Sequence, residues 1–580
     1  MRIIILLGSL ALGGLWFESA GPVPPAPRAE IEVRVVASRV AGVAPLSVYF
    51  DAAETRADGV TKPLHHLYYS WDFDDGAAAR RTASGPMAAH VFERAGRYRV
   101  ALSVTGAAGR RGQDEITIDV AEPAAVFAGA RTICFANDAA GFAGAPADAE
   151  HVVTTDFDAA LDRFGSGRRL LFRRGDRFAC RREHALQTDR ATQLGAFGAV
   201  VEPDARGIAA NAPLVQCEGE GFLLGVRGRG LRLTDLEFAR AAAAGGVVDA
   251  QHQTEALLLL RLSARGFDAP VVVSPDIVEY HNADMHRGLF MVDCRWAAFG
   301  GVGAYLGAER GAVLGCSFGA SPTTHVLRIA FARDFIVAQN DLADAAPGRH
   351  VLKLHAQQKV SRYGRYAERI LIADNRFAGS VDWCVAVGPQ NASSDEALRD
   401  VIIERNRLVL RGGVNTGLYL NSAATTVRNN VLLAEAVTSD ELDLIAITRR
   451  GIEPVPDGVE VYHNTGYCAP ASGLRTVRLV HVQEHGPAEA RVANNLLAAP
   501  DGIERCAACG EGAFAGEANV AAAAPGLVDA VGGDVSLRPD AAALGSGVAV
   551  PVFADAEGRP RAPTAVDVGA YARPQAPTAR

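Results

Sequence analysis

Three side chains able to hold or move a proton fall in two neighbouring segments of this 580-residue chain. The segment from His325 to Ala330 aligns with the segment from His350 to His355 at an offset of 25 residues. Their apolar residues alternate, so each segment predicts a β-strand in which Arg328, Lys353 and His355 point away from the core. A lysine beside another cation has a lowered pKa and can act as a general base. We therefore predict proton abstraction by Lys353, assisted by Arg328 and His355.

Lysine is rare in this chain, which makes its position informative. The 58 Lys and Arg residues include only three lysines, Lys62, Lys353 and Lys359. Arginine keeps its proton in proteins, so a lysine at a central strand position predicts a group that has to lose one. The alternative is that Lys353 is an ordinary solvated side chain on an exposed strand.

A stripe of further polar and aromatic residues is predicted beside these three. The same alternation places outward residues one segment earlier and two segments later, and a basic, aromatic loop follows Lys353 directly. Cations and aromatic rings together suit an acidic sugar polymer, through charge pairing and stacking; the alternative for the loop is a solvated surface. The predicted substrate-binding residues are Tyr305, Tyr419, Asn421, Lys359, Arg362 and Arg365.

These strands require a repeating scaffold to hold them. Ten short segments share an apolar run, then Asn or a small or apolar residue, one skipped position and usually a bulky apolar residue. Steps of 22 to 35 residues between them are too irregular for a helical solenoid and suit coils of short strands. The repeated Asn predicts a ladder of stacked amides at the corners of the coils of a parallel β-helix. The segments begin at Leu236, Leu260, Cys294, Cys316, Asn340, Asn375, Asn406, Asn430, Asn464 and Asn495.

Both ends of this scaffold carry further signals. Asp156 is a suitable N-cap for a short helix that would cover the first coil. The segment from Asp555 to Arg561, followed by that from Asp567 to Tyr571, is similar to the closing segment of many secreted pectate-lyase-like proteins. This resemblance implies a right-handed parallel β-helix over residues 130–575.

Residues 31–121 are predicted to form a separate antiparallel β-sandwich. Alternation from Ile31 to Val35 and from Tyr98 to Val104 is typical of strands. The motifs between them resemble, in this order, those of the polycystic kidney disease (PKD) domain, an immunoglobulin-like module. The resemblance implies a spacer or weak binding unit beside a carbohydrate-active domain, and an all-β chain overall. The motifs are Pro45 to Asp51, Trp71 to Gly76, His90 to Phe92 and Gly96 to Tyr98.

The outward stripe resembles, in its chemistry, that of polysaccharide lyase family six, whose members cleave alginate and chondroitin by β-elimination. In that family a lysine takes the proton beside the uronate carboxylate and an arginine assists at the leaving oxygen. Lys353 resembles the base, and either Arg328 or Arg376 the arginine. Calcium often neutralises the carboxylate there, so calcium is the cofactor that the resemblance implies. The Asn- and Glu-rich pattern of its ligands is not found, and no metal ligand is assigned.

A polar cluster precedes the strand that begins near Leu289. Glu279, His281, Asp284 and His286 lie within eight residues. They are candidates for metal binding or for paired acid and base chemistry. Their irregular spacing favours a polar loop at the rim of the predicted groove.

The nine cysteines are an odd number, so at least one thiol is unpaired within the chain. Cys294 and Cys316 occupy equivalent places in consecutive coils, where we expect two stacked, buried thiols rather than a bridge. Cys506 and Cys509 are expected to form a small loop disulfide in an oxidising compartment.

The N-terminus predicts export. Residues 1–20 combine a positive charge with an apolar run, as a signal peptide does. Glu18 fits a cleavage site after Ala20 poorly, so an uncleaved membrane anchor is the alternative. Residues 21–30 are rich in proline and predict a stiff linker. We therefore predict a secreted, periplasmic or cell-surface protein with no membrane span beyond this segment.

Composition limits the class of partner. A net charge of −8, with 21% charged and 49% hydrophobic residues, fits a globular protein and excludes a basic nucleic-acid binder. We predict a monomeric polysaccharide lyase that acts on an acidic, uronate-containing polymer. One alternative is a polygalacturonase-type inverting hydrolase, which needs paired carboxylates about 6.5 to 9.5 Å apart. The other is a non-catalytic surface protein that binds glycans.

Overall fold

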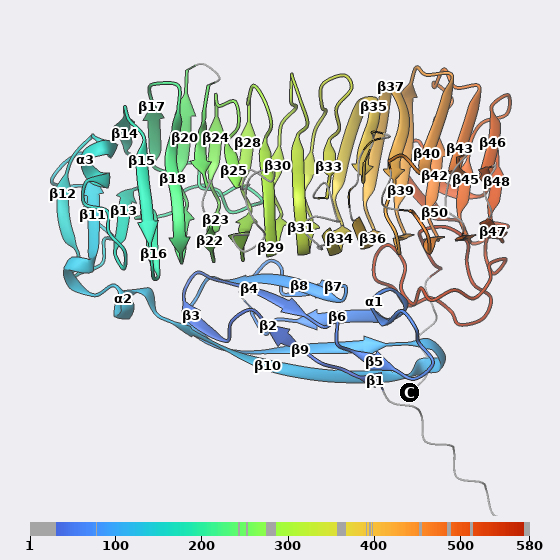
Figure 1. Ribbon diagram of the computed structural model, residues 1–580, viewed down its shortest axis with the longest axis horizontal. Helices are drawn as coiled ribbons and strands as arrows, with labels where there is room; N and C mark the ends of the chain where they lie inside the picture. The colour runs from blue at the N-terminus through green and yellow to red at the C-terminus, as the bar shows by residue number, and fades with distance from the viewer. Residues whose placement is uncertain are drawn as a thin grey trace, which may run out of the picture.

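The computed structural model shows a nearly all-β chain in which a small sandwich lies along the flank of a long β-helix (Figure 1). The predicted signal peptide and proline-rich linker lie outside the described residues. Among the residues described, no helix is long and apolar enough to cross a membrane. The description covers residues 31–573 except 77, 242–243, 251–252, 274–285, 357–366, 390, 392, 394–395, 397, 452–454, 484–488 and 511–513.

The sandwich contains ten strands and one short helix: β1 (Ile31–Glu32), β2 (Val36–Ala37), β3 (Ala41–Val43), β4 (Leu46–Asp51), β5 (Arg56–Ala57), α1 (Pro63–His66), β6 (Tyr68–Asp72), β7 (Thr82–Ser84), β8 (Met87–Phe92), β9 (Gly96–Thr105) and β10 (Arg111–Ala121). Its two main sheets have the orders β3-β10-β9-β6-β7 and β2-β4-β8. Phe50 packs between them, with its ring centroid 5.7 Å from that of Trp71 and 5.6 Å from that of Phe73. This confirms the predicted immunoglobulin-like sandwich.

From β11 (Thr132–Ala136) onward, parallel strands stack in coils and form one 38-stranded sheet. Each strand pairs in register with its counterpart in the next coil, as Leu352 does with Val385 and Val385 with Leu418. The interior is one continuous apolar core, so the predicted right-handed parallel β-helix is confirmed. The strands on the side that carries Arg328 and Lys353 are β21 (Gly246–Asp249), β25 (Val271–Val273), β29 (Ala304–Leu314), β31 (Leu327–Ala338), β33 (Leu352–Leu354), β35 (Arg376–Val387), β37 (Arg407–Leu420), β40 (Glu441–Ile447), β43 (Thr476–Val482) and β46 (Glu504–Gly510).

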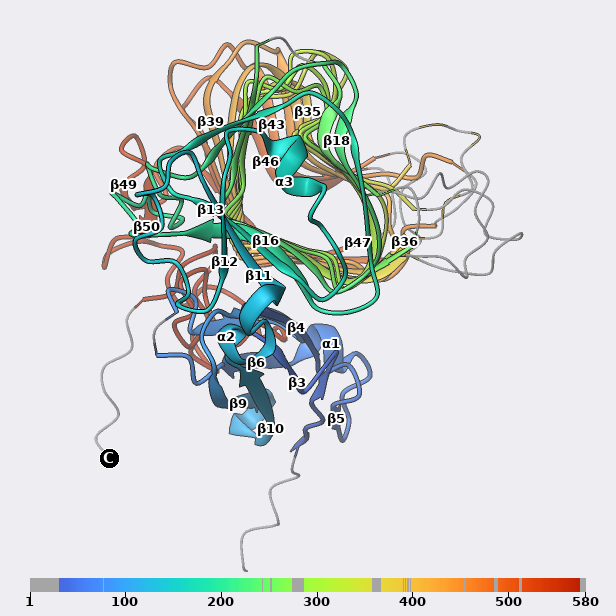
Figure 2. The same cartoon turned by 90° about the vertical axis from the view of Figure 1, so that its left-hand side faces the viewer.

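A short helix, α3 (Phe157–Leu161), lies across the N-terminal end of the β-helix (Figure 2). Asp156 caps it as predicted, since its Oδ1 accepts hydrogen bonds from the backbone N–H of Asp158 at 2.9 Å and of Ala159 at 3.1 Å. Phe157 and Leu161 belong to the same core as the first coils. The helix therefore covers apolar side chains that an open coil would expose.

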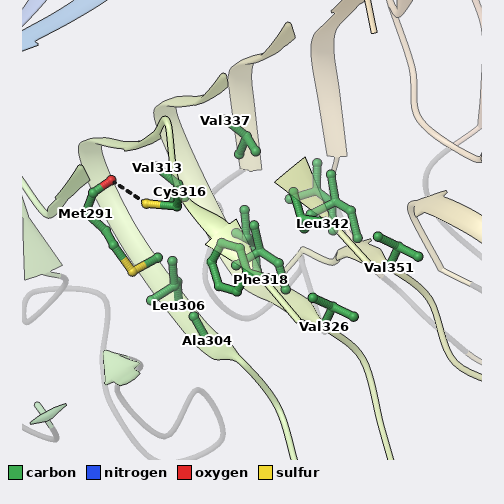
Figure 3. Packing of buried hydrophobic residues seen from close by; sticks show 14 of the residues in the cluster. Met291, Ala304, Leu306, Val313, Cys316, Phe318, Val326, Val337, Leu342 and Val351 are labelled. Carbon is green, nitrogen blue, oxygen red and sulfur yellow. Dashed lines mark hydrogen bonds between the residues drawn. The ribbon is translucent and has the colours of Figure 1, made fainter. Parts of the chain in front are cut away.

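Side chains of consecutive coils stack on one another in the core (Figure 3). Phe318 and Leu342, for example, are register partners in neighbouring coils. Cys294 and Cys316 are fully buried and unbridged, and the Sγ of Cys316 donates a hydrogen bond to the carbonyl oxygen of Met291 at 3.4 Å. The expected pair of stacked thiols is confirmed.

The asparagine ladder forms one corner of the coils. In each step the Nδ2 of one asparagine donates to the Oδ1 of the next, at 2.9 to 3.0 Å. The residue before the ladder position is left-handed, with φ of 58° at Asp374 and 55° at Arg405, which turns the chain sharply. The ladder residues are Asn340, Asn375, Asn406, Asn430, Asn464, Asn495 and Asn519.

Replacing Asn375 by alanine is expected to lower the free energy of unfolding by about 3 kcal/mol. Its Oδ1 accepts from both the backbone N–H and the Nδ2 of Asn340, at 3.0 and 2.9 Å, so the variant leaves two buried donors without an acceptor. Urea unfolding measures the loss. Asn415→Ala, at an exposed position, is the matched control and should change stability by less than about 0.5 kcal/mol. Equal effects of the two changes would show that the asparagine ladder does not stabilise the β-helix.

The sandwich covers an outer face of the β-helix that is apolar. Two in-register columns of outward side chains form this face. Tyr49 of β4 and Met87 and Val91 of β8 pack against them in one buried cluster. The columns are Leu258, Phe290, Ala312, Ile336, Leu371 and Ile402, and Leu260, Val292, Leu314, Ala338 and Ala373.

Polar contacts fix the sandwich further. The Nη1 of Arg80 donates to the Oδ2 of Asp293 at 2.9 Å, and the Nη1 of Arg261 donates to Glu93 at 2.7 Å. Arg428 donates from Nη1 to the carbonyl oxygen of α1 residue His65 at 2.7 Å. An apolar core and ion pairs at several coils make the sandwich a fixed part of the molecule. The resemblance implied a spacer or a weak binding unit, and a module fixed in this way is more than a spacer.

Candidate active site on the outer face of the coils

The strands that carry Arg328 and Lys353 bend where two consecutive residues face the core. Val351 and Leu352 both belong to the core, which leaves His350 and Lys353 on the outside. Every coil therefore presents two outward positions side by side, and we call the surface that they form the site face. It comprises His325, His350, Trp383, Thr416, Asp443 and Arg478 in one column and Tyr305, Arg328, Lys353, Ala386, Tyr419, Ala446 and His481 in the other.

The predicted alignment of this face is confirmed by the register of the strands. Tyr305 pairs with Arg328, and Arg328 with Lys353. Lys353 pairs with Ala386, which pairs with Tyr419. The structure thus brings Tyr305, Arg328 and Lys353 onto three successive coils.

Lys353 is fully buried, with 0% of its surface exposed. Its Nζ donates a hydrogen bond to the carbonyl oxygen of Gly388 at 2.7 Å. Burial is the main reason that its pKa falls from 10.5 to about 7; Glu396 opposes this shift and Arg328 adds to it. The lowered pKa agrees with a lysine that can lose its proton, but the burial keeps its amine away from solvent.

Lys353→Met is expected to stabilise the protein by about 3 kcal/mol near pH 7. Because the pKa of Lys353 is lower in the folded than in the unfolded chain, the unfolded state binds more protons between about pH 7 and 10.5, and wild-type stability rises with pH across that window. The full penalty below pH 7 is about 5 kcal/mol, and losing the hydrogen bond to Gly388 offsets about 2 kcal/mol of the gain.

Urea unfolding of Lys353→Met at pH 7 and pH 10 measures this difference. The advantage of the variant should shrink as the pH rises from 7 to 10. An advantage that is the same at both pH values would mean that Lys353 titrates alike in the folded and unfolded chain.

His355 is the part of this centre that reaches the surface, with 23% of its side chain exposed. Its Nδ1 lies 3.6 Å from the Oε1 of Glu396, whose other carboxylate oxygen accepts from the backbone N–H of Ala356 at 3.1 Å. Burial lowers the pKa of His355, Lys353 lowers it further, and Glu396 raises it. The imidazole is therefore neutral at pH 7 and able to accept a proton.

Arg328 lies beside this pair and is held by an aromatic ring. Its guanidinium carbon is 4.9 Å from the centroid of the Tyr305 ring, within range of a cation–π contact. Its Nε is buried and has no hydrogen-bond partner among the described residues. The side chain as a whole is partly exposed, so the rest of its guanidinium can meet a carboxylate or another anion from outside the chain.

Of the aromatic and amide residues predicted to bind substrate, Tyr305 is partly exposed, whereas Tyr419 and Asn421 are buried. Trp383 is partly exposed and stacks on Tyr419, with centroids 4.3 Å apart. Tyr419 and Asn421 are buried: the Tyr419 hydroxyl donates to the carbonyl oxygen of Pro389 at 2.7 Å, and Asn421 donates to the same oxygen at 3.3 Å. Tyr419 and Asn421 therefore support the turn at Gly388 and Pro389. Trp383, which sequence reasoning missed, also contacts His350 and Arg450 and remains partly exposed.

Arg376 is not brought to this centre. It begins β35, ten positions before the residue that pairs with Lys353, and its Nη1 donates to Asp341 at 3.0 Å. Lys359, Arg362 and Arg365 lie outside the described residues. Of the two arginines that the sequence offered as assistants, the structure places Arg328 beside Lys353.

A second cluster on the site face was also missed by sequence reasoning. The Oδ2 of Asp443 accepts from the Nδ1 of His481 at 2.8 Å and from Gln483 at 3.1 Å. The Nε of Arg478 donates to the Oδ1 of Asp443 at 2.5 Å. The sequence carries a signal for this cluster: the core pairs Leu444 with Ile445 and Leu479 with Val480 repeat the core pair of the earlier coils. The outward residues predicted from the strand pattern extended only to Asn421.

The polar cluster near Leu289 is described only in part. Glu279, His281 and Asp284 lie outside the described residues. His286 is fully buried, its Nδ1 is 2.8 Å from the hydroxyl of Thr254, and burial lowers its pKa to about 4. His286 is therefore a structural histidine, because it is buried and hydrogen-bonded within the chain.

The disulfide expected between Cys506 and Cys509 is absent, and that prediction is wrong. Both thiols are free and lie in β46, not in a loop. Cys506 pairs with Arg478 and Cys509 with His481, so both extend the columns of the site face by one coil.

Comparison with known proteins agrees with this description. Residues 44–120 match the PKD domain family, and no curated protein matches the chain in sequence. A solved family 28 exopolygalacturonase of Yersinia enterocolitica is 8% identical, with a TM-score of 0.42, over 84% of this chain and 98% of that one. The periplasmic alginate epimerase AlgG is 10% identical, with a TM-score of 0.32, over 61% and 77%.

A structure of carbohydrate-binding modules from the β-sandwich superfamily is 23% identical to this chain, with a TM-score of 0.15. The similarity covers 17% of this chain and 37% of that one, so it spans little more than a third of that protein's length. The sandwich motifs, the family match and the stacked coils lead to one conclusion. The chain joins a PKD domain to a right-handed parallel β-helix.

Proposed function

We propose that this chain is an exported polysaccharide lyase that cleaves a uronate-containing polymer by β-elimination at His355 and Arg328. One observation carries the proposal: a partly exposed histidine with a lowered pKa, 3.6 Å from a buried carboxylate, lies beside a partly exposed arginine. A neutral imidazole can take the proton next to the carboxylate of the sugar. The guanidinium can hold that carboxylate.

In this mechanism His355 takes the proton from C5 of the uronate. The electrons of the C–H bond form a double bond between C4 and C5, the bond from C4 to its oxygen breaks, and that oxygen takes a proton from water. Arg328 stabilises the negative charge that develops on the carboxylate. Glu396 orients the imidazole. Lys353, which the sequence favoured as the base, is a positioning residue here, because it is buried and lowers the pKa of His355.

The site face is long enough to contact more than one sugar unit. Four coil steps separate Lys353 from His481, which is about 19 Å at the usual strand spacing. Trp383 lies between the two clusters, and the part of its side chain that is exposed can pack against a sugar. Arg478 and His481 supply a second set of polar groups, so several sugar units would be bound along the coils.

Ultraviolet absorbance during incubation with alginate, pectate, chondroitin and heparin-like polymers tests this function. β-elimination leaves a double bond conjugated to the carboxylate, so absorbance should rise on one of these polymers. Reducing ends that appear without a rise in absorbance would replace the proposal with a hydrolase. Neither signal on any polymer would leave a binding protein.

The binding protein is the second candidate, and a specific observation favours it. Lys353, Tyr419 and Asn421 are buried and hydrogen-bonded within the chain, as structural residues are. A glycan-binding surface would need only the exposed residues of the site face. Retardation of the protein in gels that contain an uncleaved acidic polymer would support it.

A further inference from the structure

A group of metal-ligating side chains lies at the N-terminal end of the β-helix, far along the chain from the site face. Asp158 of α3, Cys180 and His184 each offer one ligand atom, and these three atoms lie within 4.8 Å of one another. Cys180 ends β14 (Arg177–Cys180) and His184 begins β15 (His184–Thr188). All three side chains are buried or nearly so.

A fourth candidate ligand lies in the next coil. Cys217, the last residue of β17 (Leu214–Cys217), is the register partner of Cys180. As register partners on neighbouring strands, the two residues have backbones about 4.8 Å apart. Cys217 is buried and unbridged, as is Cys180. The donor set at this point is therefore two thiols, one imidazole and one carboxylate.

We propose that Asp158, Cys180, His184 and Cys217 form a structural zinc site that fastens the capping helix to the first two coils. Thiolate and imidazole ligands in a closed set of four are typical of structural zinc. Ligand atoms around a tetrahedral zinc ion are about 3.3 to 3.8 Å apart. Asp158, Cys180 and His184 reach this spacing with small side-chain movements, and the Cys217 thiol has to turn toward them. The ligands come from a helix and from strands of two coils, so one ion would join segments that are distant in the sequence.

Protons at this centre occupy the place that the ion would take. The Nε2 of His184 lies 2.8 Å from the Oδ1 of Asp158, an arrangement that holds one proton between them. Binding of zinc would release that proton and those of the two thiols. The other oxygen of Asp158 already accepts from the backbone N–H of Arg181 at 2.9 Å, which fixes the carboxylate. The Asp158 side chain is 12% exposed, so an ion can reach the site from outside.

Metal content and cobalt spectra of the full-length, thiol-reduced protein test the proposal. After dialysis against zinc chloride alone and removal of excess metal, the wild type should retain one zinc ion per chain. Cobalt in its place should give the thiolate-to-metal band and the strong visible bands of a tetrahedral site. Zinc should raise the midpoint of thermal unfolding relative to EDTA-treated protein.

Cys180→Ser and Asp158→Asn should each lose the stoichiometric zinc and the spectrum, and two different changes guard against one variant that fails to fold. Cys134→Ser removes another buried thiol of the first coils and should keep both signals. A reduced wild type that retains no zinc, or a Cys180→Ser variant that retains it, would overturn the site. A disulfide between Cys180 and Cys217 in protein isolated without reductant would also overturn it.

Discussion

His355→Ala is expected to lower the rate of elimination by about 10²- to 10⁴-fold on the polymer that responds, because a positioned general base contributes that much. The residue is partly exposed and its Nδ1 faces Glu396, so the loss should occur without unfolding. Initial rates of absorbance increase at saturating polymer measure the effect, with circular dichroism to check the fold. His151→Ala, an exposed histidine of β12 (Glu150–Val153), is the matched control and should retain full activity.

The pH dependence of the rate distinguishes a base from a residue that only shapes the groove. Because the pKa of His355 lies below 6.5, wild-type activity should persist below pH 6.5 and fall only as the imidazole becomes protonated. Glu396 raises that pKa, so Glu396→Gln should move the acidic limb to still lower pH. A limb that stays in place in Glu396→Gln, or a His355→Ala variant with wild-type rates, would remove His355 from the mechanism.

Much of the fold could be predicted from the sequence, because residues that are register partners in a β-helix recur as a repeated pattern along the chain. A ladder residue such as Asn375 needs a partner one coil away, and a core pair such as Val351 with Leu352 repeats in each coil. Periodic demands of this kind are visible without coordinates. The sequence did not predict how the sandwich packs against the β-helix. An apolar run such as Leu257 to Leu260 predicts that both sides of a strand are buried, but it does not identify what covers the outer side.

The site was predicted in part, for the same physical reason. Strand alternation placed Arg328, Lys353 and His355 on one face, and the register confirms this for Arg328 and Lys353. The carbonyl oxygen that accepts the hydrogen bond of buried Lys353 belongs to the turn at Gly388. Glu396 comes from a loop 40 residues after Ala356, which it contacts. The sequence suggested that Asp395 and Glu396 could close one side of the groove. It did not pair Glu396 with His355, because loop conformation follows from tertiary contacts rather than from a repeat.

Met87→Asp is expected to lower the free energy of unfolding by about 4 kcal/mol. Met87 is 0% exposed and packs with Tyr49 and Val91 against the outer columns of the β-helix. An aspartate there has either to be buried without a partner or to separate the sandwich from the coils. Separation would expose the apolar columns, and a patch of that kind favours aggregation. Urea unfolding and size-exclusion chromatography measure the two consequences.

The matched control is Val36→Asp, which places the same charge on a side of the sandwich where the native side chain is 46% exposed. This change should alter stability by less than about 0.5 kcal/mol and leave the protein monodisperse. If Met87→Asp behaved like Val36→Asp, the sandwich would not be packed firmly against the β-helix, and its role as a spacer or weak binding unit would stand. If Met87→Asp destabilises and aggregates the protein, the PKD domain is an integral part of the fold. Its strands then bury the apolar columns on the outer face of the β-helix.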